Sequence, residues 1–198
     1  QIRHLGEIVA PVLKRSRCSN IFIYGKTGTG KTAVVKYVLN KLGQKAVELG
    51  SSVKICYINC RLVGTEYRIF SGLCDAIGIY VPFTGLALGE VFDRFKHGLN
   101  EREMVLMVVL DEIDELVKTR GDVLLYELTR MNESLGESKT ILIGISNDLR
   151  FKEFLDPRVL SSLGEEEIVF KLKPTEDILK EMGRKKKKQI LVGFSLET

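Results

Sequence analysis

One stretch constrains the fold of this chain more than any other: Gly25-Lys26-Thr27-Gly28-Thr29-Gly30-Lys31-Thr32. It fits the phosphate-binding pattern G-x-x-x-x-G-K-[ST] at every fixed position, between a short apolar run and a helix-compatible segment. Glycine accepts the positive φ angles that turn backbone N–H groups toward phosphate oxygens, and the helix that follows directs its positive dipole end to the same place. We expect Lys31 to reach the β- and γ-phosphates and the Thr32 hydroxyl to hold Mg²⁺. The stretch therefore predicts nucleotide binding.

The composition indicates one soluble globular domain. The chain has 198 residues, of which 44% are hydrophobic and 28% charged, and no apolar run approaches the length of about 20 residues that spans a bilayer. With no secretory signal, we expect a cytoplasmic, nucleoid-associated protein with no membrane partner. The net charge of +4 permits contact with nucleic acid but does not by itself indicate it.

The cysteines favour a reducing compartment. They lie in or beside apolar stretches without C-x-x-C spacing, so we expect buried, reduced thiols: Cys18, Cys56, Cys60 and Cys74. Because the chain has only two histidines, a zinc site is not expected.

Apolar runs alternate with segments of helical periodicity along the chain. Strands are predicted at about 20–24, 52–59, 104–110, 140–146 and 167–171, and helices at about 1–17, 33–49, 66–77, 86–99, 113–119 and 121–134, with a further helix start at Pro157. Pro11 is expected to bend or break the first helix, and Gly43 is a second possible break. Strands that are apolar on both faces predict an α/β fold, a parallel sheet with helices on both faces.

Polar residues follow two of the buried strands. Asp111 stands where phosphate-loop folds place a Mg²⁺-organising carboxylate, and Glu112 is a candidate general base for an attacking water. Acidic residues that only complement a helix dipole are the structural alternative for this pair. Asn147 could orient a water or contact a γ-phosphate, or simply cap a turn. Arg158 could stabilise phosphoryl charge for a neighbouring subunit, although most surface arginines are only solvated.

With these residues assembled, the chain resembles an AAA+ ATPase of the archaeal origin-recognition and cell-division-control initiator family. The stretches that carry the resemblance lie at 20–32, 57–61, 81–85, 109–114 and 155–163. The resemblance implies that residues 25–32 are Walker A, that Asp111 and Glu112 are Walker B, that Asn147 is sensor 1 and that Arg158 is the arginine finger. It also implies ATP or ADP with Mg²⁺ as cofactors.

The resemblance further implies partners and a domain division. The partners are double-stranded origin DNA, other initiator subunits and the replicative helicase, with DNA contacts at Val81, Pro82, Phe83, Thr84 and Gly85. From composition alone the apolar and glycine-punctuated stretch at 78–89 is either a packed connection or an exposed contact element. We expect an AAA+ base domain over 1–173 and a short basic tail over 174–198, a possible lid remnant. No sensor 2 arginine and no winged helix are recognised, which suggests a shortened initiator.

Three functions follow as hypotheses. The first is an ATP-binding, weakly hydrolysing AAA+ module that acts in origin recognition or helicase loading. The second is a nucleotide-bound regulatory or interaction subunit without a DNA-binding domain of its own. The third, a phosphate-loop kinase for a small molecule, is disfavoured because no acceptor pocket or Arg-rich lid is evident.

Overall fold

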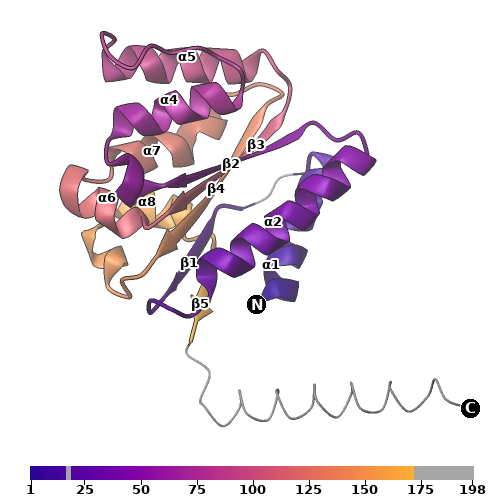
Figure 1. Cartoon of the computed structure of the whole chain (residues 1–198), viewed down its shortest axis with the longest axis vertical. Helices are drawn as coiled ribbons and strands as arrows, with labels where there is room; N and C mark the ends of the chain where they lie inside the picture. Colours follow the sequence, from indigo (N-terminus) through magenta and orange to yellow (C-terminus); the bar gives the residue numbers. More distant parts are fainter. Residues whose placement is uncertain (17–18, 172–198) are drawn as a thin grey trace, which may run out of the picture.

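The computed structural model describes residues 1–16 and 19–171, and its centre is a five-stranded parallel sheet. The strand order is β2-β3-β4-β1-β5 (Figure 1). The strands are β1 (Ile21–Gly25), β2 (Val53–Asn59), β3 (Val105–Asp111), β4 (Lys139–Ser146) and β5 (Glu166–Phe170). The α/β fold with a parallel sheet is confirmed.

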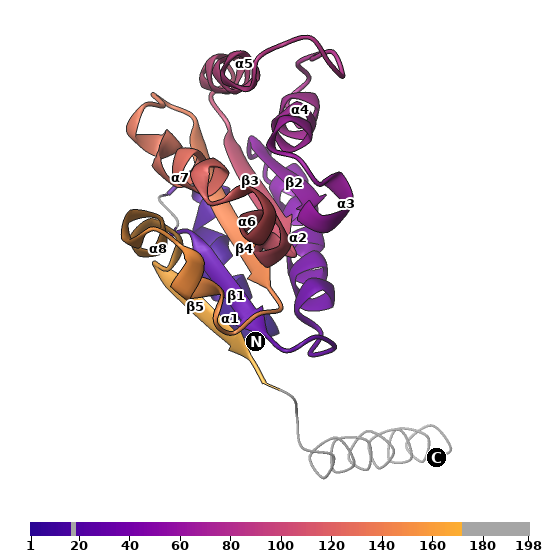
Figure 2. The same ribbon diagram turned by 90° about the vertical axis from the view of Figure 1, so that its left-hand side faces the viewer.

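Helices cover both faces of the sheet, and each face has its own apolar core (Figures 1 and 2). One face carries α1 (Ile2–Val9), the 3₁₀ helix η1 (Ala10–Lys14) and α2 (Lys31–Glu48). The other carries α4 (Glu66–Ala76), α5 (Leu88–Asn100), α6 (Ile113–Arg120), α7 (Val123–Arg130) and α8 (Pro157–Leu163). Strand β3 is buried throughout because its side chains alternate between the two cores, with Met107 in one and Leu106 in the other.

The structure tests where the predicted helices break and adds short helices that were not predicted. Pro11 marks a break, since the α-helix gives way to η1 at that point. The possible break at Gly43 is wrong, because α2 continues through it with Leu42 and Ala46 buried on either side. The short helix α3 (Cys60–Val63) was not predicted; the Asn59 side chain caps it by accepting the Leu62 N–H at 3.1 Å. The 3₁₀ helices η2 (Met131–Glu133) and η3 (Phe151–Phe154) were also not predicted.

Three cysteines are buried and free, as expected: Cys56, Cys60 and Cys74. Burial raises the pKa of the Cys60 thiol to about 12, with the Asp111 charge as a smaller cause. Cys18 lies outside the described residues, as does the predicted tail over 174–198. Within the described ranges, none of the helices has the length and apolar character needed to cross a membrane.

The strand register brings the carboxyl ends of four strands to one edge of the sheet. Asn59 of β2 pairs with Asp111 of β3, which pairs in turn with Ile145 of β4. Ser146 then lies beside Tyr24 of β1, immediately before the glycine-rich loop. This edge is where open parallel sheets place their ligands.

Candidate functional site

The glycine-rich loop joins β1 directly to α2, as the motif requires. Gly28 and Gly30 have φ angles of 81° and 84°, a region that side chains other than glycine rarely enter. Gly30 is the N-cap of α2, and no side chain caps this terminus. The unpaired N–H groups and the positive dipole end of an 18-residue helix are therefore directed at the loop, an arrangement that favours an anion.

Lys31 lies folded beneath this loop. Its ammonium donates to the carbonyl oxygen of Gly25 at 2.7 Å and to that of Lys26 at 3.0 Å, and its side chain is buried. Burial lowers the pKa of Lys31, and the charges of Asp111 and Asp114 partly offset this effect. The carbonyl oxygens thus hold the ammonium at the place where the loop would receive phosphate.

Asp111 and Thr32 are in direct contact across the site. The Thr32 hydroxyl donates to Oδ2 of Asp111 at 2.8 Å, which joins the start of α2 to the end of β3. The same carboxylate oxygen accepts a hydrogen bond from the hydroxyl of Tyr57, whose ring carries the Lys36 ammonium 4.2 Å from its centroid. Burial, followed by the hydrogen bond to Asp111, raises the pKa of Tyr57. This phenol therefore keeps its proton near neutral pH and donates it to the Asp111 carboxylate.

The donor set fits Mg²⁺ in the way that nucleotide enzymes bind it. Mg²⁺ is usually held by one or two carboxylates together with substrate phosphates, with no need for a cage of protein ligands. Asp111 and Thr32 provide a carboxylate and a hydroxyl of that kind beside the phosphate loop. Among the described residues no cluster of three or more His, Cys, Asp or Glu side chains could hold a metal by itself.

Glu112 occupies a strained position at the end of β3. Its φ of 55° is left-handed, a conformation that costs a non-glycine residue about 1–3 kcal/mol and that recurs at functional sites. The backbone N–H of Glu112 donates to Oδ1 of Asp111 at 3.0 Å, so both oxygens of that carboxylate are engaged. The turn at Glu112 starts helix α6 directly beside the predicted metal ligand.

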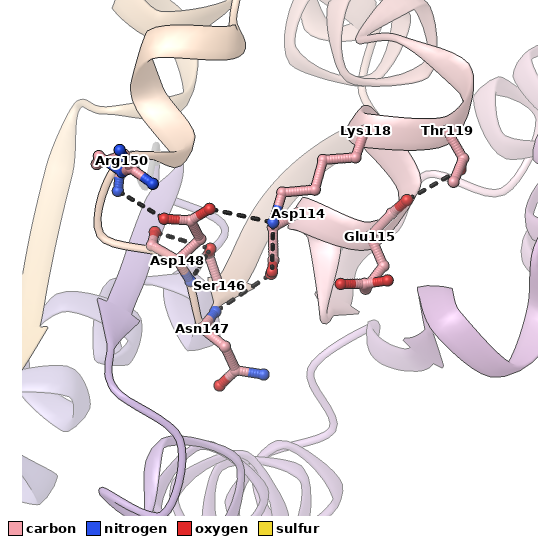
Figure 3. A network of polar contacts seen from close by, with 8 residues as sticks. All are labelled: Asp114, Glu115, Lys118, Thr119, Ser146, Asn147, Asp148 and Arg150. Atoms are coloured by element: carbon pink, nitrogen blue, oxygen red, sulfur yellow. Dashed lines mark hydrogen bonds and ion pairs between the residues drawn. The ribbon is translucent and has the colours of Figure 1, made fainter.

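Asn147 follows β4, and a network of polar contacts holds its backbone (Figure 3). Its N–H donates to Oδ1 of Asp114 at 3.2 Å. Figure 3 shows the side-chain amide of Asn147 pointing away from this network, and the amide makes no hydrogen bond within the described part of the chain. Asn147 is thus held by its backbone while its amide remains available for a ligand.

Arg158 lies at the start of α8 and is exposed, with 69% of its side chain accessible. Its guanidinium donates to both oxygens of Asp156 at 3.0 and 3.1 Å and lies 5.2 Å from the ring centroid of Tyr126. Asp156 also caps the helix, which starts at Pro157 as predicted, by accepting the Arg158 N–H at 2.8 Å. The structure therefore does not bring Arg158 together with the phosphate loop of its own chain.

The segment 81–85 is partly a packed connection and partly an exposed element, the two alternatives that its composition left open. Val81 and Pro82 are half-buried, whereas Phe83 is 92% exposed and its neighbour Tyr80 81% exposed. Leu62, on α3, is 82% exposed and lines the same open groove of about 570 Å³. Arg68 and Asp75 add one charge of each sign to the groove lining. The result is an exposed apolar and aromatic surface on a packed base.

Three residues of the site and its surroundings were not predicted as functional from the sequence: Tyr57, Asp114 and Leu62. Tyr57 reads as an ordinary strand residue, and only the pairing of β2 with β3 brings it to Asp111. Asp114 did carry a signal, since it lies three residues after Asp111 and thus on the first turn of the helix that follows. Leu62 carried none, because its exposure depends on the unpredicted helix α3.

Two family models match the chain. The model described as AAA domain matches residues 14–152. A second model, described as DNA/pantothenate metabolism flavoprotein C-terminal domain, matches residues 137–198, which overlaps the first match and includes 172–198 outside the described residues.

Similar proteins cover most of this chain. The ORC1-type DNA replication protein 1 of Sulfolobus acidocaldarius is 50% identical over 187 residues, which cover 93% of this chain and 46% of that protein. The structure of the Aeropyrum pernix ORC1 protein in complex with DNA has a TM-score of 0.83 and 45% identity over 93% of this chain and 48% of that one. The Aeropyrum pernix ORC2 protein in ADPNP–ADP complexes shares the fold, with a TM-score of 0.74 and 20% identity over 92% of this chain and 50% of that one. The chain spans about half the length of these relatives.

Proposed function

The chain belongs to the AAA domain family that its residues 14–152 match, and on this premise we propose that it is an ATP-binding AAA+ module that acts in the initiation of DNA replication. The similarity to ORC1-type replication proteins over 93% of the chain supports the biological role. One observation carries the chemistry: the Thr32 hydroxyl and the Asp111 carboxylate are 2.8 Å apart beside a loop shaped for phosphate. This contact supports the assignment of residues 25–32 as Walker A and of Asp111 to Walker B.

In this proposal, residues 25–32 enclose the phosphates of ATP. The backbone N–H groups at the start of α2 donate to phosphate oxygens, and Lys31 exchanges its carbonyl partners, Gly25 and Lys26, for the β- and γ-phosphates. Thr32 and Asp111 would hold Mg²⁺, which when bound neutralises the charge that develops on the phosphates. Because the ammonium is already beside the loop, little rearrangement precedes binding.

Hydrolysis would be slow and would use three further side chains. Glu112 accepts a proton from the attacking water, and the amide of Asn147 orients that water or contacts the γ-phosphate. Arg158 completes the site of a neighbouring subunit, which agrees with its exposure and its distance in the fold from its own phosphate loop. Turnover in this proposal therefore depends on assembly.

The partners proposed are double-stranded origin DNA, other initiator subunits and the replicative helicase. The DNA complex of the similar Aeropyrum pernix ORC1 protein supports the first of these. Tyr80 and Phe83 form the apolar surface that would contact DNA, where insertion of apolar side chains into a groove accompanies DNA distortion. The corresponding location of the protein is the cytoplasm, in association with the nucleoid.

Lys31→Ala tests the nucleotide-binding proposal. Titration calorimetry with ADPNP and Mg²⁺ should show an affinity at least about tenfold weaker, because a charge-assisted contact to phosphate is lost. Lys41→Ala, which removes an exposed lysine from the same helix, is the matched control and should bind as the parent chain does. Equal affinity in the Lys31→Ala and parent chains would refute the proposal.

A further inference from the structure

Helix α6 contacts the segment after β4 at two points, and both contacts are ionic or charge-assisted (Figure 3). Asp114, on the first turn of α6, is only 4% exposed and accepts the backbone N–H of Asn147 at 3.2 Å. One turn further along, the Lys118 ammonium lies 3.0 Å from Oδ2 of Asp148 and 3.9 Å from Oδ2 of Asp114. Residues 147 and 148 are therefore tied to α6 side by side.

The segment is also closed upon itself. The buried Ser146 hydroxyl accepts the Asp148 N–H at 3.0 Å, and the Asp148 carboxylate accepts the Arg150 N–H at 2.9 Å. The Arg150 backbone contact and then the Lys118 contact lower the pKa of Asp148, so this carboxylate is charged at neutral pH. The turn is thus anchored to β4 through Ser146 and to α6 through Asp114 and Lys118.

The same helix begins at the catalytic carboxylates. Glu112 is the N-cap of α6, and its left-handed backbone turns the chain so that Asp114 faces β4. A displacement of α6 would therefore move Glu112 and Asn147 together. The side-chain amide of Asn147 takes no part in the network. The network therefore holds the backbone of Asn147 and leaves its amide free to contact a ligand.

We propose that Asp114 is a positioning residue that sets the amide of Asn147 at the γ-phosphate and couples it to the Asp111–Glu112 end of α6. The proposal rests on the γ-phosphate role of Asn147 in the proposed function. Lys118 extends the tie by bridging Asp114 to Asp148. The property that this tie controls is the preference for a nucleoside triphosphate over a diphosphate, because only the triphosphate presents the group that Asn147 contacts.

A double-mutant cycle tests this coupling on the full chain. The measured quantity is the ratio of ADP to ADPNP dissociation constants with Mg²⁺ present, for the parent, Asp114→Ala, Asn147→Ala and the double variant. Each single change should lower the ratio about tenfold, because an oriented hydrogen bond to a charged group is lost. The double variant should fall no further than Asn147→Ala alone. Independent, multiplying losses would overturn the proposal.

Two conservative variants separate positioning from mere support of the fold. Asp114→Asn keeps an oxygen that can accept the Asn147 N–H, so it should retain most of the triphosphate preference. Lys118→Met leaves the buried Asp114–Asn147 hydrogen bond in place and changes a side chain that is 40% exposed. It therefore replaces Asp114→Ala in the test if that variant does not fold. It should lower the ratio several-fold in the parent and not at all beside Asn147→Ala; an equal loss in both backgrounds would overturn the coupling.

Glu115→Gln is the matched control. Glu115 neighbours Asp114 on α6, and its one hydrogen bond in Figure 3 is accepted by its backbone carbonyl, from Thr119 at 2.9 Å. This variant should keep the parent ratio. If Asn147→Ala leaves the ratio unchanged, the γ-phosphate role of Asn147 fails, and the inference fails with it. If Asn147→Ala lowers the ratio and Asp114→Ala does not, the inference alone is overturned.

Discussion

Two hydroxyl groups from distant parts of the chain meet on one oxygen of Asp111. Thr32 is the residue that the motif assigns to the metal, whereas Tyr57 comes from the strand β2 beside β3 and lies outside the phosphate-binding motif. In the proposed complex the Thr32 hydroxyl would turn from Asp111 to the metal, and the Tyr57 hydroxyl would remain to hold the carboxylate in place. At the scale of the residue, the orientation of Asp111 therefore depends on a tyrosine.

Tyr57→Phe tests this dependence. The Mg²⁺ concentration that gives half-maximal ADPNP affinity should rise about fivefold, which corresponds to about 1 kcal/mol for one hydrogen bond. Affinity measured in EDTA should not change, because the variant leaves the phosphate loop intact. Tyr37→Phe, at an exposed position on α2, is the matched control. An unchanged Mg²⁺ requirement in Tyr57→Phe would contradict the role.

At the scale of the element, the region from β2 to α5 combines a rigid base with an exposed rim. Asn59 ends β2 and caps α3, which places Leu62 in solvent beside Tyr80 and Phe83. Ile79 and Val81 pack against the core beneath them. An apolar rim that is anchored from below keeps its shape without a partner and is well suited to press into a DNA groove.

Phe83→Ala should weaken binding to duplex DNA roughly tenfold or more, since burial of a phenylalanine side chain contributes about 1.5–3 kcal/mol. Fluorescence anisotropy with a labelled duplex measures the effect, and ADPNP affinity should stay at the parent value. Phe154→Ala removes an equally apolar, exposed ring from η3 and serves as the control. Equal DNA affinities in the two variants would show that this rim is not the contact surface.

The sequence predicted the elements far better than their contacts. Strand β3 and the loop after β1 were found because burial on both faces and a fixed glycine spacing are local signals. The possible break at Gly43 was wrong because a glycine costs a helix only about 1 kcal/mol, less than burial of Leu42 returns. Tyr57 became a functional candidate only through the pairing of β2 with β3, which no local pattern encodes. The place of Asp114 after Asp111 is a local signal, but its contact with Asn147 depends on how α6 packs beside β4.

At the scale of the whole molecule, the proposed nucleotide site and Arg158, the proposed arginine finger, lie on separate surfaces. The phosphate loop leads into α2 on one face of the sheet, whereas Arg158 lies in the first turn of α8 on the other face (Figure 2). In the single chain, the Arg158 guanidinium is held by the Asp156 carboxylate and lies over the Tyr126 ring. To act as proposed, Arg158 would exchange its contacts with Asp156 and Tyr126 for the phosphate bound by a neighbouring subunit.

Mixing two inactive variants tests whether one chain completes the site of another. Lys31→Ala lacks a working nucleotide site, Arg158→Ala lacks the finger, and each alone should hydrolyse ATP at least about 100-fold more slowly than the parent. An equal mixture should recover on the order of a quarter of the parental rate, because one interface in about four joins an intact site to an intact finger. Steady-state phosphate release measures this. A mixture as inactive as its components would rule out action between chains.

The most direct measurement of the central claim is a crystal structure of the chain with ADPNP and Mg²⁺. We predict the triphosphate within the loop at residues 25–32, Lys31 at the β- and γ-phosphates, and Mg²⁺ beside the Thr32 hydroxyl and the Asp111 carboxylate, groups that are 2.8 Å apart here. A nucleotide bound elsewhere, or one held in the loop with its metal away from both Thr32 and Asp111, would contradict the account.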